Sequence, residues 1–344
     1  MNPLLLKLIL LVSVLICMYI LFTLLQKRNS FLHLQWQKKK EGFEVVKNNI
    51  VPVNETYASM RLEQYVMKAA FNSAYGNDDQ ISKENLKRII EDEGVRFLDF
   101  AVYEQNKKPV VGFSNSYDNT IASNNTMPFH AIMNTVAETA FQTQNARDPL
   151  FIHLRIKSES QPLLSSIAET LENTFREKRY SKMVTKKTKL KTLMNKVVFI
   201  MDTTPNYVPR YETILCHKNN KGCVDLRDII NINSTDFLSM NEDKVISQTQ
   251  SPPTAQTGRK IKNRRKMKVA DMRMTTPNLY NYDGSNTDSF FKLVHDYGVQ
   301  VCMHQFYIND DGLRKYKQFF QKQRSVFVPL SAAIAYVANN GGPE

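Results

Sequence analysis

Apolar and polar positions repeat along the chain with two different periods, and these predict a series of strands and helices. The nearly continuous apolar run at 196–202 is typical of a strand covered on both faces of a parallel sheet. Apolar residues at helical spacing predict helices at 127–142, 163–178 and 289–298. The other predicted strands lie at 95–103, 108–113, 148–158, 268–274, 299–307 and 325–331. Because strands and helices recur in turn, the pattern indicates a parallel α/β sheet, either open or closed.

The first apolar segment differs from the others in its length. Residues 4–25 are mostly apolar, and they are long enough to cross the ~30 Å hydrocarbon core of a bilayer. A cleaved signal peptide would have a shorter apolar core followed by small residues, whereas Gln26, Lys27 and Arg28 follow here. We therefore expect a single-pass membrane protein with a basic juxtamembrane linker at 26–59. The positive-inside rule predicts that the C-terminal body lies on the cytosolic side.

Positive charge is concentrated in two segments of a chain whose formal net charge is +13. Residues 176–196 carry nine lysines and arginines against one glutamate, and residues 259–268 carry seven in ten positions. A Ser-, Thr-, Gln- and Pro-rich tract precedes the second run, so residues 241–268 are predicted to form a disordered basic linker. Beside a membrane anchor, such runs favour anionic lipid as a partner. The second run lacks the interleaved aromatic residues that stack on bases, so no nucleic acid is expected.

Several motifs of the body occur in an order that a known family shares. They are AAFNSAYG, RFLDFAVY, KPVVGF, a Pro-Phe helix and FIHLRIKS, followed after the linker by MRMTTP and GVQVCMHQFY. Together they resemble the X and Y regions of phosphatidylinositol-specific phospholipase C. The resemblance implies an α/β fold, a distorted (β/α)8 TIM barrel with its active site at the C-terminal ends of the strands. It divides the body into an X-like half at 60–240, a Y-like half at 269–335 and a tail at 336–344. Among such proteins, the chain is most similar to membrane-anchored ones of large DNA viruses.

The resemblance also assigns each functional position of the family to a residue of this chain. The two catalytic histidines fall on Phe71 and Phe113. The four calcium ligands, an asparagine and three acidic residues, fall on Asn72, Asp99, Ala101 and Arg155. The phosphate-binding lysines and the substrate-binding arginine and tyrosine fall on Ile200, Asp202, Arg273 and Thr275.

These assignments predict a site without the family's chemistry. Phenylalanine has no group that titrates, so the general acid–base contribution, typically 10²–10⁴-fold per group, is absent at Phe71 and Phe113. Arg155 places a permanent positive charge where a dication would bind. Asn72 and Asp99 alone are too few oxygen ligands for tight calcium binding. We therefore expect a pseudoenzyme without a cofactor, with calcium bound only if the site is active.

Two residues of the strand at 148–158 admit more than one interpretation. His153 shares a strand face with Arg155 and could replace the missing acid or base, although a structural barrel histidine is the simpler interpretation. Arg155 could form a metal-free phosphoinositide pocket with Lys157 and Arg273, or it could simply pair with Asp99.

The sequence therefore predicts a membrane-anchored, inactive protein that binds an anionic phospholipid, a phosphoinositide head group or a protein partner. Two alternatives stay open: an active phosphoric diester hydrolase with a rebuilt site, and a structural membrane or envelope protein.

Overall fold

The fold is described here from a computed structural model. It covers residues 49–113, 120–158, 160–202, 224–234, 239–241, 272–277, 286 and 290–339. The predicted transmembrane segment at 4–25, most of the linker at 26–59 and nearly all of the linker at 241–268 lie outside these residues. Residues Asn48–Glu344 form one compact unit. None of the helices in the described ranges is both long enough and apolar enough to cross a bilayer.

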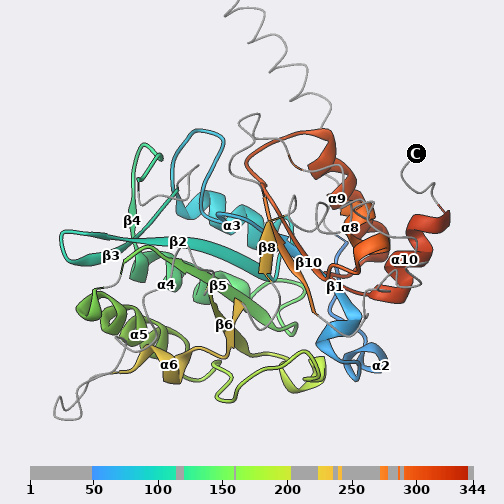
Figure 1. Cartoon of the computed structure of the whole chain (residues 1–344), viewed down its shortest axis with the longest axis horizontal. Coiled ribbons are helices and arrows are strands. Elements are labelled where there is room, and N and C mark those ends of the chain that lie inside the picture. Colours follow the sequence, from blue (N-terminus) through green and yellow to red (C-terminus); the bar gives the residue numbers. More distant parts are fainter. Residues whose placement is uncertain are drawn as a thin grey trace, which may run out of the picture. The chain divides into compact units, whose positions relative to one another are not determined.

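Parallel strands form a curled sheet at the centre of this unit (Figure 1). In chain order they are β1 (Tyr65–Ala70), β2 (Phe97–Gln105), β5 (Leu150–Ile156), β6 (Val197–Met201), β7 (Ile232–Asn233), β8 (Ser239–Asn241), β9 (Met274–Thr276) and β10 (Val301–His304). Their order in the sheet is β7-β6-β5-β2-β1-β10-β9-β8. The first parallel strand of the chain, β1, is therefore paired with the last one, β10. This is the strand order of a (β/α)8 barrel, and no pairing joins β7 to β8 among the described residues.

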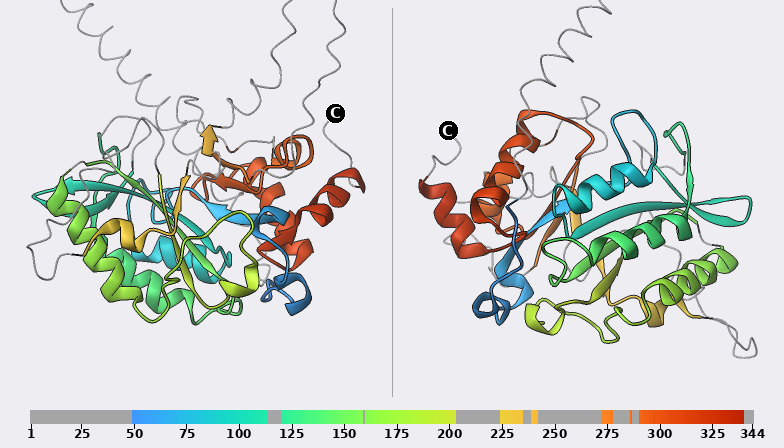
Figure 2. Two further views of the ribbon diagram at one scale, coloured as in Figure 1. Left: turned by 60° about the horizontal axis from the view of Figure 1, so that its bottom comes forward. Right: turned by 180° about the vertical axis from the view of Figure 1, so that it is seen from behind.

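Helices cover the outer face of the sheet (Figures 1 and 2). They are α3 (Lys83–Glu91), α4 (Phe129–Ala140), α5 (Gln161–Phe175), α6 (Leu226–Ile229), α8 (Phe290–Tyr297), α9 (Asp311–Gln323) and α10 (Leu330–Asn339). The short helix α2 (Glu55–Ala58) and the 3₁₀ turns η1 (Leu62–Gln64) and η2 (Leu190–Thr192) pack instead with the residues inside the curl of the sheet. Strand residues alternate between two apolar clusters. Leu98 and Ile152 pack outward against the helices. Phe97 and Phe151 pack inside the curl of the sheet.

Two predicted strands exist but are not strands of the parallel barrel. β3 (Lys108–Gly112) returns antiparallel to β2, and β4 (Met127–Pro128) pairs with β3. Asn106 and Lys107 form the two-residue turn with φ of 51° and 60°, the conformation that a tight hairpin requires. β11 (Phe327–Pro329) is likewise antiparallel to β1. The hairpin brings Gly112 back beside Ala101, which positions Phe113 near the C-terminal ends of the barrel strands.

Candidate functional site

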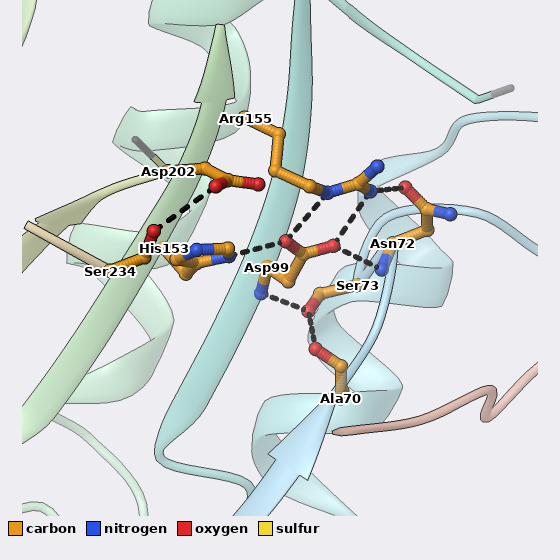
Figure 3. Close-up of polar contacts among 8 residues, drawn as sticks. All are labelled: Ala70, Asn72, Ser73, Asp99, His153, Arg155, Asp202 and Ser234. Atoms are coloured by element: carbon orange, nitrogen blue, oxygen red, sulfur yellow. Dashed lines mark hydrogen bonds and ion pairs between the residues drawn. The ribbon is translucent and has the colours of Figure 1, made fainter. Parts of the chain in front are cut away.

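Several residues expected at the active site, among them Asn72, Asp99 and Arg155, meet where β1, β2 and β5 lie side by side (Figure 3). Asp99 lies beside His153 in the register of β2 and β5, and Ala101 lies beside Arg155. Asn72 follows the end of β1. Parallel pairing therefore brings together residues that are far apart in the sequence, and every one of these side chains is buried.

An ion pair between Asp99 and Arg155 forms the centre of this site. Arg155 Nε donates to Asp99 Oδ1 at 2.9 Å, and Arg155 Nη2 donates to Asp99 Oδ2 at 2.8 Å. Burial alone would raise the pKa of Asp99, but the charge of Arg155 and a hydrogen bond from His153 outweigh it and lower this pKa. The Asp99 charge in turn raises the pKa of Arg155 despite its burial. The pair is thus ionised and bidentate, so the expectation that Arg155 pairs with Asp99 is confirmed.

Residues after β1 complete the hydrogen bonding of this pair. Asn72 adopts a φ of 47°, and its backbone N–H donates to Asp99 Oδ2 at 2.9 Å. The Asn72 side-chain oxygen accepts from Arg155 Nη2 at 2.5 Å. Ser73 Oγ accepts from the Asp99 backbone N–H at 3.0 Å and donates to the Ala70 carbonyl at 3.3 Å. The loop after β1 therefore holds both the backbone and the carboxylate of Asp99 in place.

His153 contacts the other side of the same carboxylate. Its Nδ1 lies 2.7 Å from Asp99 Oδ1, and this nitrogen carries the proton because an ionised carboxylate can only accept. Its Nε2 has no hydrogen-bond partner within the described part of the chain, although the ring is fully buried. The hydrogen bond to Asp99 therefore fixes the orientation of the His153 ring, as a carboxylate does for a catalytic histidine. The ring is 0% exposed, however, so solvent does not reach it.

Charged groups of opposite sign surround the pair. Asp202, directly after β6, accepts a hydrogen bond from Ser234 Oγ at 3.1 Å, and its charge also contributes to the raised pKa of Arg155. Lys157 follows β5 and is 6% exposed; its backbone N–H donates to the Val102 carbonyl at 2.7 Å. Asp99 and Asp202 each carry one formal negative charge, and Arg155 and Lys157 each carry one formal positive charge, so the formal charges of this set balance. A balanced set of buried charges does not create a strong field for either a cation or an anion.

Aromatic rings occupy the two positions to which the sequence resemblance assigned the catalytic histidines. The Phe71 ring lies under the guanidinium of Arg155, with 4.2 Å between the Arg155 Cζ and the ring centroid. The Phe113 ring stacks on Tyr75 at a centroid distance of 3.9 Å and an interplanar angle of 7°. Tyr307 meets Phe113 edge-on at 5.7 Å. Both phenylalanines thus make packing contacts, and neither side chain can transfer a proton.

Arg273 is not part of this cluster. It precedes β9, at the N-terminal end of the sheet, and its Nη1 donates to the carbonyl of Tyr297 at the end of α8. Met272 and Met274, on either side of it, pack in the inner cluster, so Arg273 lies on the other strand face. Arg155 and Lys157 lie two residues apart at the end of β5, whereas Arg273 lies at the opposite end of the sheet, so the three residues of the predicted pocket are not brought together.

The residues present do not fit a calcium ion. The oxygens of Asn72 and Asp99, which would be its ligands, accept hydrogen bonds from Arg155 instead. Ala101 supplies no oxygen from its side chain. Within the described ranges, no group of three or more His, Cys, Asp or Glu side chains could hold a metal ion. The guanidinium therefore takes the place that a cation would need between these oxygens.

Some members of the site were not predicted from the sequence. Ser73 lies within the AAFNSAYG motif but had no role assigned to it, and Ser234 lies outside the motifs. The aromatic contact of Tyr75 with Tyr307 joins residues more than 200 positions apart. The pairing of His153 with Asp99 could have been found, because both lie on inward-facing positions of neighbouring strands. The sequence pattern alone indicated only that His153 shares a strand face with Arg155.

Comparisons with solved structures identify the fold. PLC21 of S. officinalis matches with a TM-score of 0.57 and 13% sequence identity over 80% of this chain and 38% of its own. PLC21 of L. pealei matches with a TM-score of 0.57 and 13% identity over 82% of this chain and 38% of its own. The chain therefore spans well under half the length of these proteins. No family model and no curated protein sequence matches the chain. The likeness shows a fold of the PLC-like phosphodiesterase type.

Proposed function

We propose that this chain is a catalytically inactive protein of the PLC-like phosphodiesterase fold that acts by binding at a membrane. The Asp99–Arg155 ion pair carries the proposal, because the tethered guanidinium occupies the oxygen ligands that calcium-dependent chemistry would require. The predicted anchor at 4–25 would place the body at the cytosolic face of a membrane, including a viral one. The partners proposed are anionic phospholipid, phosphoinositide or a membrane-bound protein.

The charge balance at the site determines where such binding would occur. Arg155 uses its Nε and Nη2 donors on Asp99 and Asn72, and Asp202 adds a second negative charge nearby. A phosphate would have to compete with both carboxylates for this guanidinium. We therefore assign lipid binding to the basic surface segments and not to the former active site.

Hydrolysis and calcium binding test the proposal together. The purified full-length chain is assayed on phosphatidylinositol and on a soluble phosphodiester, with and without calcium, and its melting temperature is measured in both conditions. We expect no turnover and no calcium-dependent shift in melting temperature. The Arg155→Glu variant should gain such a shift, because it restores a third oxygen ligand beside Asn72 and Asp99, whereas the Arg155→Met variant should not. Turnover by the unmodified chain would overturn the proposal.

A second candidate rests on His153. The orientation of its ring by Asp99 and the unpartnered Nε2 are features of a general base, so an active hydrolase with a rebuilt site is the alternative. Its full burial favours the inactive protein. Activity that disappears in the His153→Ala variant and is retained in His130→Ala, a change on the exposed surface of α4, would support this alternative.

A further inference from the structure

The basic segment between α5 and β6 forms the floor of the barrel. We define this floor segment as residues 176–196. The backbone N–H of Val184 donates to the carbonyl of Asn231, just before β7, at 3.0 Å. The backbone N–H groups of Leu62 and Glu63, just before β1, donate to Thr188 and Lys186 at 3.0 and 3.1 Å. The segment therefore crosses the N-terminal end of the sheet from β7 to β1, at the end opposite to the Asp99–Arg155 site.

The floor segment is anchored from inside and presents lysines outside. Val184, Leu190 and Leu193 are 4%, 0% and 0% exposed, and they belong to the inner apolar cluster. The side chains placed between and beside them are exposed, namely Lys182, Lys187, Lys189 and Lys191. A freely solvated loop would not bury its apolar residues in this way. The lysines are thus held on a fixed surface.

Large apolar side chains lie on the same end of the molecule. Met183 is 62% exposed and Tyr57, on α2, is 51% exposed; with Val51 they are the exposed large apolar residues of the described chain. α2 lies beside the floor segment (Figures 1 and 2), and the Leu190 backbone N–H donates to the Met60 carbonyl at 3.0 Å. Lysines around exposed methionine and tyrosine are typical of surfaces that enter the headgroup region of a bilayer.

Few acidic groups oppose this charge. Glu172, on α5, pairs with Arg179 at 3.0 Å and with Arg176 at 3.9 Å. Glu63 lies 3.5 Å from Arg61. Glu177 and Glu55 are exposed. The nine basic residues of the floor segment therefore outnumber the acidic groups around them.

We infer that the floor segment, with Tyr57 and Met183, binds an anionic lipid bilayer. The body then faces the membrane with the end opposite to the Asp99–Arg155 site. The inference rests on the proposed function of the chain as an inactive, membrane-bound protein. An enzyme of this fold acting on lipid must present the C-terminal ends of its strands to the bilayer, since its active site lies there. A protein without that chemistry is free of this requirement, and its charge can set the opposite orientation.

The orientation can be measured by fluorescence quenching in the full-length chain. The single tryptophan, Trp36, is changed to Phe, and a new tryptophan is introduced as Met183→Trp. The protein is reconstituted into vesicles of phosphatidylcholine with or without phosphatidylserine, each containing brominated lipid as quencher. We expect quenching of the tryptophan at position 183 in phosphatidylserine vesicles, with little in neutral ones, and a decrease as salt is raised. The Asn77→Trp variant reports the opposite end, in the loop after β1, and should not be quenched.

Charge reversal distinguishes binding by the floor segment from binding that depends only on the net charge of the protein. Changing Lys182, Lys187, Lys189 and Lys191 to Glu should weaken the contact equilibrium about 100-fold or more, because each lysine contributes near an anionic surface. The matched variant reverses four exposed lysines elsewhere, Lys83, Lys87, Lys107 and Lys108, and should retain quenching.

Three outcomes would overturn the inference. They are quenching of the Asn77→Trp variant in place of Met183→Trp, equal losses in the two charge variants, and absence of anion-dependent quenching at either end. Binding of duplex DNA that the floor variant alone loses, without vesicle quenching, would assign the surface to nucleic acid instead. Each result leaves the hydrolysis assay unaffected, so failure of this inference is distinguishable from failure of the inactive role.

Discussion

Arg155 acts in this protein as a cation attached to the chain. It bonds the same oxygens of Asn72 and Asp99 that a bound metal would contact, and Phe71 covers one face of its guanidinium. A metal site is completed only when the ion binds, whereas an arginine completes it as soon as the chain folds. The cost is that both charges are buried, so each depends on the other for its stability.

A double-mutant cycle measures this dependence. Arg155→Met leaves Asp99 ionised and buried without its counter-ion, and Asp99→Asn leaves Arg155 in the same condition. We expect each change to lower the free energy of unfolding by about 3–5 kcal/mol. The double variant buries no unpaired charge, so it should be less destabilised than the sum of the two by about 2 kcal/mol or more. Urea unfolding provides the measurement, and additive effects would contradict an energetic coupling.

The same coupling should depend on pH with a defined sign. The pKa of Asp99 is lower in the folded chain than its ordinary value of 3.8. The ion pair therefore contributes its full stability above about pH 4 and loses it as the pH falls toward the folded-state pKa. We expect the coupling energy of the cycle to decrease when the urea experiment is repeated at acid pH. A coupling energy that stays constant at acid pH would indicate that packing, and not charge, couples Asp99 to Arg155.

At the scale of elements, the β2–β3 hairpin shows how a local feature sets the position of a site residue. Its register fixes Gly112 beside Ala101, and Phe113 follows at once. The turn uses Asn106 and Lys107 at φ of 51° and 60°. Asparagine tolerates this conformation, but lysine is strained there, and glycine is the residue that such turns prefer.

Replacing Lys107 by glycine should therefore stabilise the protein. We expect the Lys107→Gly variant to unfold with a free energy about 0.5–1 kcal/mol higher, because the positive φ no longer strains a side chain. Lys107→Val should be destabilised, since a β-branched residue is least suited to the turn. Lys108→Gly, one position later in β3, is the matched control and should destabilise slightly by weakening the strand. A loss of stability in Lys107→Gly would mean that the lysine side chain makes a contact that outweighs the strain.

The elements also show where sequence reasoning succeeds and where it does not. The strands β5 and β6 were predicted because their apolar runs are long and continuous. The strand at 108–113 was found, but its direction was not, because periodicity carries no information on whether a strand runs parallel to its neighbour. Arg273 was placed in the site by motif alone. Its strand face is set by Met272 and Met274, whose burial depends on the closure of the whole sheet.

At the scale of the whole molecule, the X-like and Y-like halves share one sheet. β10, from the second half, pairs with β1 from Met67–Val301 to Ala70–His304. Tyr316 of α9 donates to the Ala69 carbonyl and receives a hydrogen bond of 2.7 Å from the Ala69 backbone N–H, which ties the second half to β1 across 247 positions. Neither half can bury its sheet edge at β1 without the other.

Cleavage of the chain between the halves tests whether they form one folding unit. The sequence predicts a disordered linker at 241–268, so a protease site placed at Pro252–Pro253 should be cut without disturbing the sheet. We expect the two fragments to remain associated on gel filtration and to unfold in a single transition, because the β1–β10 pairing and the Tyr316 contacts are retained. Weakening the join by Tyr316→Ala should release the fragments after cleavage while the uncut variant stays folded, since only the cut chain loses the covalent link that keeps the halves at high effective concentration. Fragments that separate in the parent protein would show that β10 depends on the linker to reach β1, and that the second half is a separate addition to an open sheet.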